Sequence, residues 1–220
     1  MIKLIAFLGN YGAEYKKTRH NVAWLYAEQL PFYNKLNWQQ KFKGEYTVVD
    51  ISILAEWFGT TGMLTKKNGE NPEVPKEAPE KIFFLKPLTY MNLSGESIIA
   101  IANFYKIKPD EVLVIHDELE LPLGTISLKW SGGLGGHNGL RSTKGVFGTA
   151  DFWRLRFGIS KPINANIADY VLSNFTEDEQ IVLSQIFSQT NELFAKLILS
   201  KEPQRLIQNW GKKKLISDTN

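Results

Sequence analysis

Two periods of hydrophobic residues run along this chain, and they divide it into expected strands and helices. Short runs that are continuously apolar, or that alternate at every second position, are typical of β-strands. These runs occur at residues 2–8, 45–54, 82–87, 112–118, 125–130 and 152–160. Stretches whose apolar residues recur every three or four positions predict helices instead. These stretches occur at about residues 21–30, 94–107 and 140–147.

A longer helix is expected near the C-terminal end of the chain. Thr176 and Glu179 have the spacing of a capping box, in which each side chain binds the other residue's backbone N–H. The residues that follow share one apolar face at helical spacing. That face carries Val182, Ile186, Leu193 and Leu197.

The order of these elements sets the expected fold class. Strands are interspersed with helices, and the sequence has no internal repeat. The pattern predicts one α/β domain over residues 1–220, with a mixed, twisted sheet flanked by helices. Residues 65–81 interrupt it with three prolines, many charges and few apolar side chains. This segment predicts a surface loop inside the domain, because an apolar strand resumes directly after it.

Composition narrows the class of protein without naming a chemistry. Hydrophobic residues make up 43% and charged residues 22%, which is ordinary for a soluble globular protein. No apolar run approaches the length of a membrane-spanning helix, and the first residues are too short a run for a signal peptide. The chain has no cysteine, which excludes a thiol nucleophile, a cysteine zinc site and disulfides. We therefore expect a cytoplasmic protein without a membrane partner.

The distribution of charge is more informative than the net charge of +3. Residues 125–161 form a basic band in which Asp151 is the only acidic residue. Its cations are Lys129, Arg141, Lys144, Arg154, Arg156 and Lys161. Such a band can bind phosphate groups, and it can equally be a solvated face. Charge alone leaves both interpretations open.

Several familiar catalytic motifs are absent from the sequence. It contains no GxSxG nucleophile elbow, no GxxxxGK[ST] phosphate loop and no HExxH metal pair. The glycine-rich stretch at residues 132–139 does not fit GxGxxG, because Asn138 stands where the third glycine belongs.

Polar residues cluster where expected strands and helices begin or end. Asn10 follows the first strand, His20 precedes the first helix, and Asp117 lies at the end of a strand. Asn92 follows another strand, and the glycine-rich stretch adds His137 and Asn138. Ligands of open α/β sheets gather outside the carboxyl ends of the strands, so these side chains are expected to converge. Taken singly, each asparagine would be a turn or cap residue, and His137 a loop residue.

The chemistry of this set is that of a positioned base. A carboxylate fixes the tautomer of a histidine and supports its charged form. Asparagine amides can hold a water molecule and a carbonyl group together. His116 and Asp117 are adjacent on one strand and should face opposite sides, so a metal site that uses all three histidines is not expected.

Five ordered stretches resemble the bacterial peptidyl-tRNA hydrolase family. They are LGNYGAEYKKTRHN, KPLTYMNLSG, HDELELPLG, GGLGGHNGLRS and RLRFGISKP. The resemblance runs from about residue 2 to residue 175. It implies a monomeric α/β enzyme that cleaves the ester between peptide and tRNA, without a metal or a cofactor.

The resemblance also implies residue roles. His20 would be the general base and Asp117 its orienting partner, while Lys129 and Arg156 would clamp a tRNA phosphate. The implied substrate-binding residues are Asn10, Tyr15, Tyr90, Met91, Asn92, His137 and Asn138. The chain departs from the family pattern in two places. Tyr11 replaces a usual proline, which is expected to loosen the turn that presents Asn10, and the 65–81 insertion is longer than usual.

Two other classes of function compete with this one. An RNA-binding module could keep the fold without turnover, since fold alone does not fix function. A metal-dependent esterase is the other alternative. The retained His20, Asn92, Asp117 and Asn138 favour the enzyme over the RNA-binding module, and activity that a chelator does not affect would eliminate the metal-dependent esterase.

Overall fold

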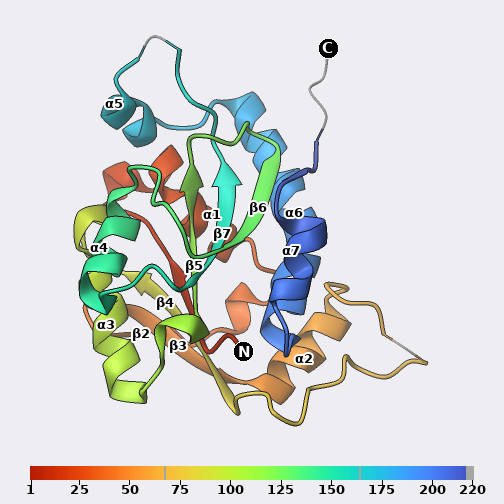
Figure 1. Ribbon diagram of the computed structural model, residues 1–220. Coiled ribbons are helices and arrows are strands. Elements are labelled where there is room, and N and C mark those ends of the chain that lie inside the picture. Colours follow the sequence, from red (N-terminus) through yellow and green to blue (C-terminus); the bar gives the residue numbers. More distant parts are fainter. Residues whose placement is uncertain (67, 164, 217–220) are drawn as a thin grey trace.

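A single mixed sheet organises the computed structural model, which describes residues 1–66, 68–163 and 165–216 (Figure 1). Within these residues the sheet has eight strands in the order β2-β3-β4-β1-β5-β7-β6-β8. The neighbours of β1 and the β5–β7 pair are parallel, and the outer pairs are antiparallel. The strands are β1 (Leu4–Phe7), β2 (Gln39–Lys41), β3 (Gly44–Asp50), β4 (Lys81–Pro87), β5 (Val112–Glu118), β6 (Thr125–Trp130), β7 (Trp153–Gly158) and β8 (Lys213–Lys214). The predicted α/β class with a mixed sheet is confirmed.

Helices cover both faces of the sheet and bury two separate cores. The larger core lies under α1 (Val22–Glu28), α2 (Ile51–Thr60), α6 (Glu177–Leu199) and α7 (Gln204–Trp210). The smaller core lies under α3 (Ser94–Tyr105) and α4 (Asn138–Phe147). Helix α5 (Ile167–Leu172) lies at one end of the molecule, with Val171 buried in the larger core (Figure 1). In the part of the chain that the structure describes, no helix is both long and apolar enough to cross a membrane.

Strand β5 shows how the sequence pattern separates the two cores. Leu113 and Ile115 belong to the larger core, while Val112 and Val114 belong to the smaller one. A strand buried on both faces reads as a continuous apolar run, which is why its bounds could be predicted. The same alternation sends Asp117 toward the α1 face and His116 toward the α4 face.

One predicted strand is wrong over part of its length. Residues 45–50 lie in β3, but Ile51 begins helix α2 instead of continuing the strand. Ile51, Leu54 and Phe58 lie on one side of this helix and are buried in the larger core. Burial at helical spacing therefore outweighs the strand preference of the β-branched residues.

Other boundaries differ by a few residues. The helix expected over residues 94–107 ends at Tyr105, followed by Lys106 in the left-handed region at φ 54°. Helix α4 begins at Asn138, inside the glycine-rich stretch 132–139 and two residues before the expected start at residue 140. No bounds were predicted for the short helices α5 and α7.

The capping box of the long helix is confirmed. Thr176 Oγ1 accepts a hydrogen bond from Glu179 N at 3.2 Å, and Glu179 Oε2 accepts one from Thr176 N at 2.8 Å. The predicted apolar face is slightly rotated, because Val182 is only half-buried and Leu183 takes its place in the core.

The segment 65–81 stays a predicted surface insertion within a single domain. Its described residues before Lys81 form no named helix or strand, and Lys81 begins β4. Val74 and Ala78 are nevertheless partly buried against the larger core.

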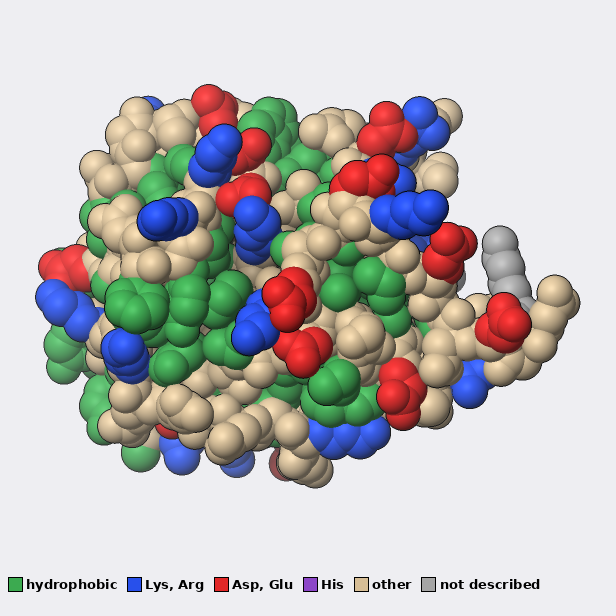
Figure 2. Space-filling model, turned by 90° about the horizontal axis from the view of Figure 1, so that it is seen from below, with side chains coloured by type: hydrophobic (Ala, Val, Ile, Leu, Met, Phe, Trp, Pro, Cys, Tyr) green, Lys and Arg blue, Asp and Glu red, His purple; other side chains and the backbone are tan. Residues whose placement is uncertain are grey.

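Seen from the side away from α5, charges of both signs are interspersed among hydrophobic side chains (Figure 2). That side therefore does not offer the uniformly basic surface that phosphate groups favour.

Candidate active site

A cleft of about 840 Å³ lies beyond the carboxyl ends of β1, β4 and β5. The turns after these strands supply most of its walls, and α5 closes one side. Every side chain for which the sequence suggested a catalytic or substrate-binding role lines this cleft. They are Asn10, Tyr15, His20, Tyr90, Met91, Asn92, Asp117, His137 and Asn138. The residues expected to converge are thus brought together.

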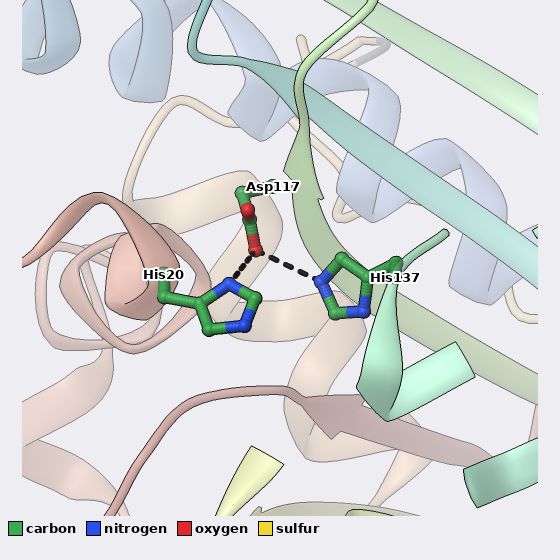
Figure 3. A group of neighbouring side chains, drawn as sticks. All are labelled: His20, Asp117 and His137. Carbon is green, nitrogen blue, oxygen red and sulfur yellow. Dashed lines mark hydrogen bonds and ion pairs between the residues drawn. The ribbon is translucent and has the colours of Figure 1, made fainter. Parts of the chain in front are cut away.

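A buried carboxylate and a histidine form the centre of the cleft (Figure 3). Asp117 is the penultimate residue of strand β5 and is 2% exposed, while His20 lies in a short 3₁₀ turn, Arg19–Asn21, directly before α1. His20 Nδ1 and Asp117 Oδ1 are 2.9 Å apart. The ionised carboxylate can only accept, so Nδ1 carries the proton and Nε2 keeps a free lone pair.

His137 binds the same carboxylate oxygen from the other side. Its Nε2 is 2.9 Å from Asp117 Oδ1, and its ring centre is 5.0 Å from that of His20 (Figure 3). His137 also caps α4, because its Nδ1 accepts hydrogen bonds from Gly139 N and Leu140 N at 3.1 and 3.4 Å. Nδ1 therefore carries no proton, and Nε2 is the donor to Asp117.

The electrostatics of the pair agree with this arrangement. Burial opposes a charge on His20, but the charge and hydrogen bond of Asp117 outweigh it and raise the pKa of His20 above 6.5. Burial would raise the pKa of Asp117, yet His20 and His137 hold it well below its ordinary value. Asp117 thus stays ionised, and His20 can take up a proton near neutral pH.

His20, Asp117 and His137 also have the composition of a metal site. One ligand atom from each lies within 4.8 Å of the others. A metal ion on His137 Nε2 would require the proton to move to Nδ1. That nitrogen faces two backbone N–H donors of α4, so the proton would be placed against other protons. The three side chains fit a hydrogen-bonded group better than a metal centre.

His116 is closer to the site than the sequence suggested. It faces the opposite side of the sheet from Asp117, as expected, but its ring centre lies 4.8 Å from that of His137. Its Nδ1 donates to the Asp117 carbonyl oxygen at 2.6 Å. Burial, and then the neighbouring His137, hold the pKa of His116 well below its ordinary value. A neutral His116 therefore acts as packing for His137.

Asn21 is a positioning residue that sequence reasoning did not assign. Its Oδ1 accepts from Asn10 N at 2.8 Å, and its Nδ2 donates to Asn10 O at 2.9 Å. Asn10 Oδ1 in turn accepts from Met91 N at 2.7 Å. These bonds tie together the turns after β1 and β4 and the start of α1. The turn that presents Asn10 is therefore held at both backbone groups, despite Tyr11.

Arg19 fixes the other side of the His20 turn. Its guanidinium donates to Ser173 Oγ at 2.7 Å and to both carboxylate oxygens of Glu179 at 2.9 and 2.6 Å. Arg19 is 6% exposed. It thus joins the turn that carries His20 to the start of α6. The sequence did not predict this contact, because Arg19 lies in a polar loop far from Glu179 in the chain.

The remaining asparagines differ from Asn10 in being exposed to the cleft. Asn92 lies in the turn Met91–Leu93, and Asn138 is the first residue of α4. Asn138 Oδ1 accepts from Arg141 Nη1 at 3.0 Å, which leaves its NH₂ group as a donor. Tyr15 and Tyr90 meet edge to face at 6.5 Å near the cleft mouth.

A mixed α/β fold with a cleft built on a histidine–carboxylate pair has the features of an enzyme that activates water. The sequence model described as Peptidyl-tRNA hydrolase matches residues 4–217. The chain belongs to this family of carboxylic ester hydrolases.

Relatives match along nearly the whole length of the chain. The chain is 43% identical over 221 residues to "Peptidyl-tRNA hydrolase" of Treponema pallidum (strain Nichols), with 98% of each chain covered. It is 41% identical over 189 residues to the protein of that name in Desulfitobacterium hafniense (strain Y51), which covers 86% of this chain and 88% of the relative. The crystal structure of peptidyl-tRNA hydrolase from Acinetobacter baumannii aligns with a TM-score of 0.72 at 30% identity, over 96% of each chain.

Proposed function

We propose that this protein hydrolyses the ester bond between peptide and tRNA in peptidyl-tRNA, with His20 as the general base for water. Family membership supports the reaction. The observation that carries the residue assignment is the His20–Asp117 bond at 2.9 Å, which leaves Nε2 as the free lone pair of His20. The released tRNA returns to translation.

The proposed mechanism needs one proton transfer in each direction. His20 Nε2 removes a proton from water as its oxygen attacks the ester carbonyl carbon. The charge of Asp117 stabilises the imidazolium that forms. The proton then passes to the ribose oxygen as the bond between that oxygen and the carbonyl carbon breaks. The products are a tRNA hydroxyl and a peptide carboxylic acid, which loses the second proton of the water to solvent and becomes a carboxylate.

Negative charge develops on the carbonyl oxygen and requires hydrogen-bond donors. The amides of Asn92 and Asn138 are available at the cleft surface. We assign these two residues to holding the substrate and the attacking water. Asn10, Met91 and His137 would shape the cleft, with Tyr15 and Tyr90 near its mouth.

Lys129 and Arg156 are proposed to bind a tRNA phosphate beside the cleft. Both lie on the same face of the sheet, because Arg156 pairs with Ser127 and Arg154 pairs with Lys129 across β6 and β7. Alanine at Lys129 or Arg156 is expected to raise KM more than it lowers kcat, and to flatten the salt dependence of tRNA binding. The measurement is a set of KM, kcat and tRNA Kd values over a range of salt concentrations.

The control for this pair is another cation of the basic band. Lys161 forms an exposed ion pair with Glu120 at 3.1 Å and lies outside strands β6 and β7, which carry Lys129 and Arg156. Lys161→Ala is expected to leave the salt slope unchanged. If Lys129→Ala and Arg156→Ala behave like this control, the band is a solvated face.

A non-catalytic RNA-binding module is not favoured, because the base, its carboxylate and the cleft asparagines are all present. The discriminating experiment is incubation of the protein with a peptidyl-tRNA in EDTA. We expect free tRNA to appear. Binding without release of tRNA would support the RNA-binding module, and loss of activity in EDTA would support a metal-dependent esterase.

Two further properties belong to the proposal. We infer a monomer in the cytoplasm, because the family resemblance implies a monomer and a chain without cysteine suits a reducing compartment. Size-exclusion chromatography with light scattering is the test of the monomer.

A further inference from the structure

Strands β5, β7 and β6 place a cluster of charges on the α4 face, next to the cleft. In register, His116 pairs with Arg156, which pairs with Ser127, and Glu118 lies two residues beyond His116. Of the charged side chains that these three strands direct to this face, Lys129, Arg154 and Arg156 are cations and Glu118 is the carboxylate. A face of this kind attracts anions, and Glu118 is its internal anion.

The two proposed phosphate ligands are not equally available. Arg156 Nη1 donates to Glu118 Oε2 at 3.1 Å, and Nη2 donates to Ser127 Oγ at 2.6 Å. In contrast, Lys129 makes no hydrogen bond or ion pair with any residue that the structure describes. Its pKa is lowered, first by partial burial and then by the charges of Arg156 and Arg154. One cation is therefore free for a phosphate, and the other already holds a carboxylate.

Arg154 does not replace Arg156 in this role. Its guanidinium is buried, and it donates to the carbonyl oxygens of Gly133 and Gly132 at 2.6 and 2.8 Å. It therefore anchors the glycine-rich loop that leads to His137. Lys129 and Arg156 are therefore the cations of this face that remain for a phosphate.

The Glu118–Arg156 ion pair is sheltered enough from water to compete measurably with a phosphate for Arg156. Its side chains are 12% and 17% exposed, so water screens the pair less than a surface ion pair. Glu118 directly follows Asp117 on β5 and also lines the cleft. A carboxylate and a phosphate both bind the fork of an arginine, so the two anions exclude each other at Arg156.

We propose that Glu118 is a built-in competitor of the tRNA phosphate for Arg156, so that it weakens tRNA binding and favours release of the product tRNA. The inference rests on the proposed function, because it requires the phosphate site at Lys129 and Arg156. Binding of tRNA breaks the Glu118–Arg156 ion pair, and departure of tRNA restores it. The Glu118 side chain therefore sets the affinity without contacting the reacting atoms.

The test uses the full chain and deacylated tRNA, so it needs no turnover. Glu118→Gln keeps the shape and the acceptor oxygen but removes the charge, and it is expected to tighten tRNA binding about three- to tenfold. The inhibition constant of deacylated tRNA in the hydrolysis reaction should fall by the same factor. Glu120→Gln is the matched control, because Glu120 pairs with Lys161 at the surface, and it should change neither constant.

The competition must act through Arg156, and a double mutant tests this. In an Arg156→Ala background, Glu118→Gln is expected to leave the Kd of tRNA unchanged. Equal tightening with and without Arg156 would show a general charge effect and overturn the proposal. Unchanged or weaker binding by Glu118→Gln alone would overturn it too, and would assign Glu118 to orienting Arg156. Release of tRNA from peptidyl-tRNA is measured separately, so a failure here is distinct from a failure of the proposed function.

Discussion

His20→Ala lowers kcat by about two to four orders of magnitude while tRNA binding survives, since this is the usual loss when a general base is removed. His20 Nδ1 donates to Asp117, so Nε2 is the nitrogen left to accept a proton from water. His137 cannot replace it. His137 Nδ1 accepts two amide N–H groups of α4, and its Nε2 carries the proton that binds Asp117. The measurement is single-turnover hydrolysis of peptidyl-tRNA beside the Kd of deacylated tRNA.

His20→Asn is the matched variant for this experiment. The asparagine NH₂ group can take the place of Nδ1–H and keep the hydrogen bond to Asp117, but it offers no base at the Nε2 position. We expect it to be as inactive as His20→Ala, with a melting temperature closer to that of the wild type. Near-normal turnover in either variant would mean that His20 is not the base.

Asp117→Asn lowers kcat by about one to three orders of magnitude, less than His20→Ala, because the base remains but its charged form loses support. The variant also shifts the pH dependence. In the wild type the neutral form of His20 is active, so kcat/KM falls as the pH drops through the raised pKa of His20, above 6.5. Without the charge of Asp117, burial acts alone and lowers the pKa of His20. The acidic limb should therefore move to lower pH.

The pH profile separates this role from a purely structural one. Loss of folding would lower kcat/KM at every pH, whereas loss of charge support moves the acidic limb. An Asp117→Asn variant with reduced activity and an unmoved limb would show that Asp117 only holds the fold of the cleft. The pH profile of kcat/KM for Asn92→Ala is a useful comparison. Asn92 is exposed, and no hydrogen bond joins it to His20 in the part of the chain that the structure describes.

The sequence located the strands that build the site because both of their faces are buried or alternate cleanly. β5 and β6 have the predicted bounds, and Asp117 could be placed at a strand end for that reason. The strand prediction was wrong for residues 51–54. Their β-branched side chains are typical of a strand, but the chain buries Ile51, Leu54 and Phe58 along one side of a helix. Packing against the rest of the fold set the secondary structure of this segment, and the local sequence pattern carries no information about that packing.

The sequence predicted which residues form the site, but not the hydrogen bonds between them. His20, Asp117 and the asparagines stand at element ends, where the chain order of an α/β sheet brings side chains together. The clamp of Asn21 on Asn10, and the pair of Glu118 with Arg156, depend on how turns and strands meet in register. Arg156 and Glu118 are 38 residues apart in the chain, and no periodicity links them. Such partners follow from the folded structure alone.

Hydrolysis of a peptidyl-tRNA in water enriched with ¹⁸O tests the central claim most directly. The account predicts that the protein releases tRNA, that one ¹⁸O enters the new carboxylate of the peptide, and that the ribose oxygen of the tRNA keeps its original isotope. His20→Ala should show the same labelling at a greatly reduced rate. Label in the ribose hydroxyl, or tRNA that binds without being released, would contradict attack of water on the ester carbonyl.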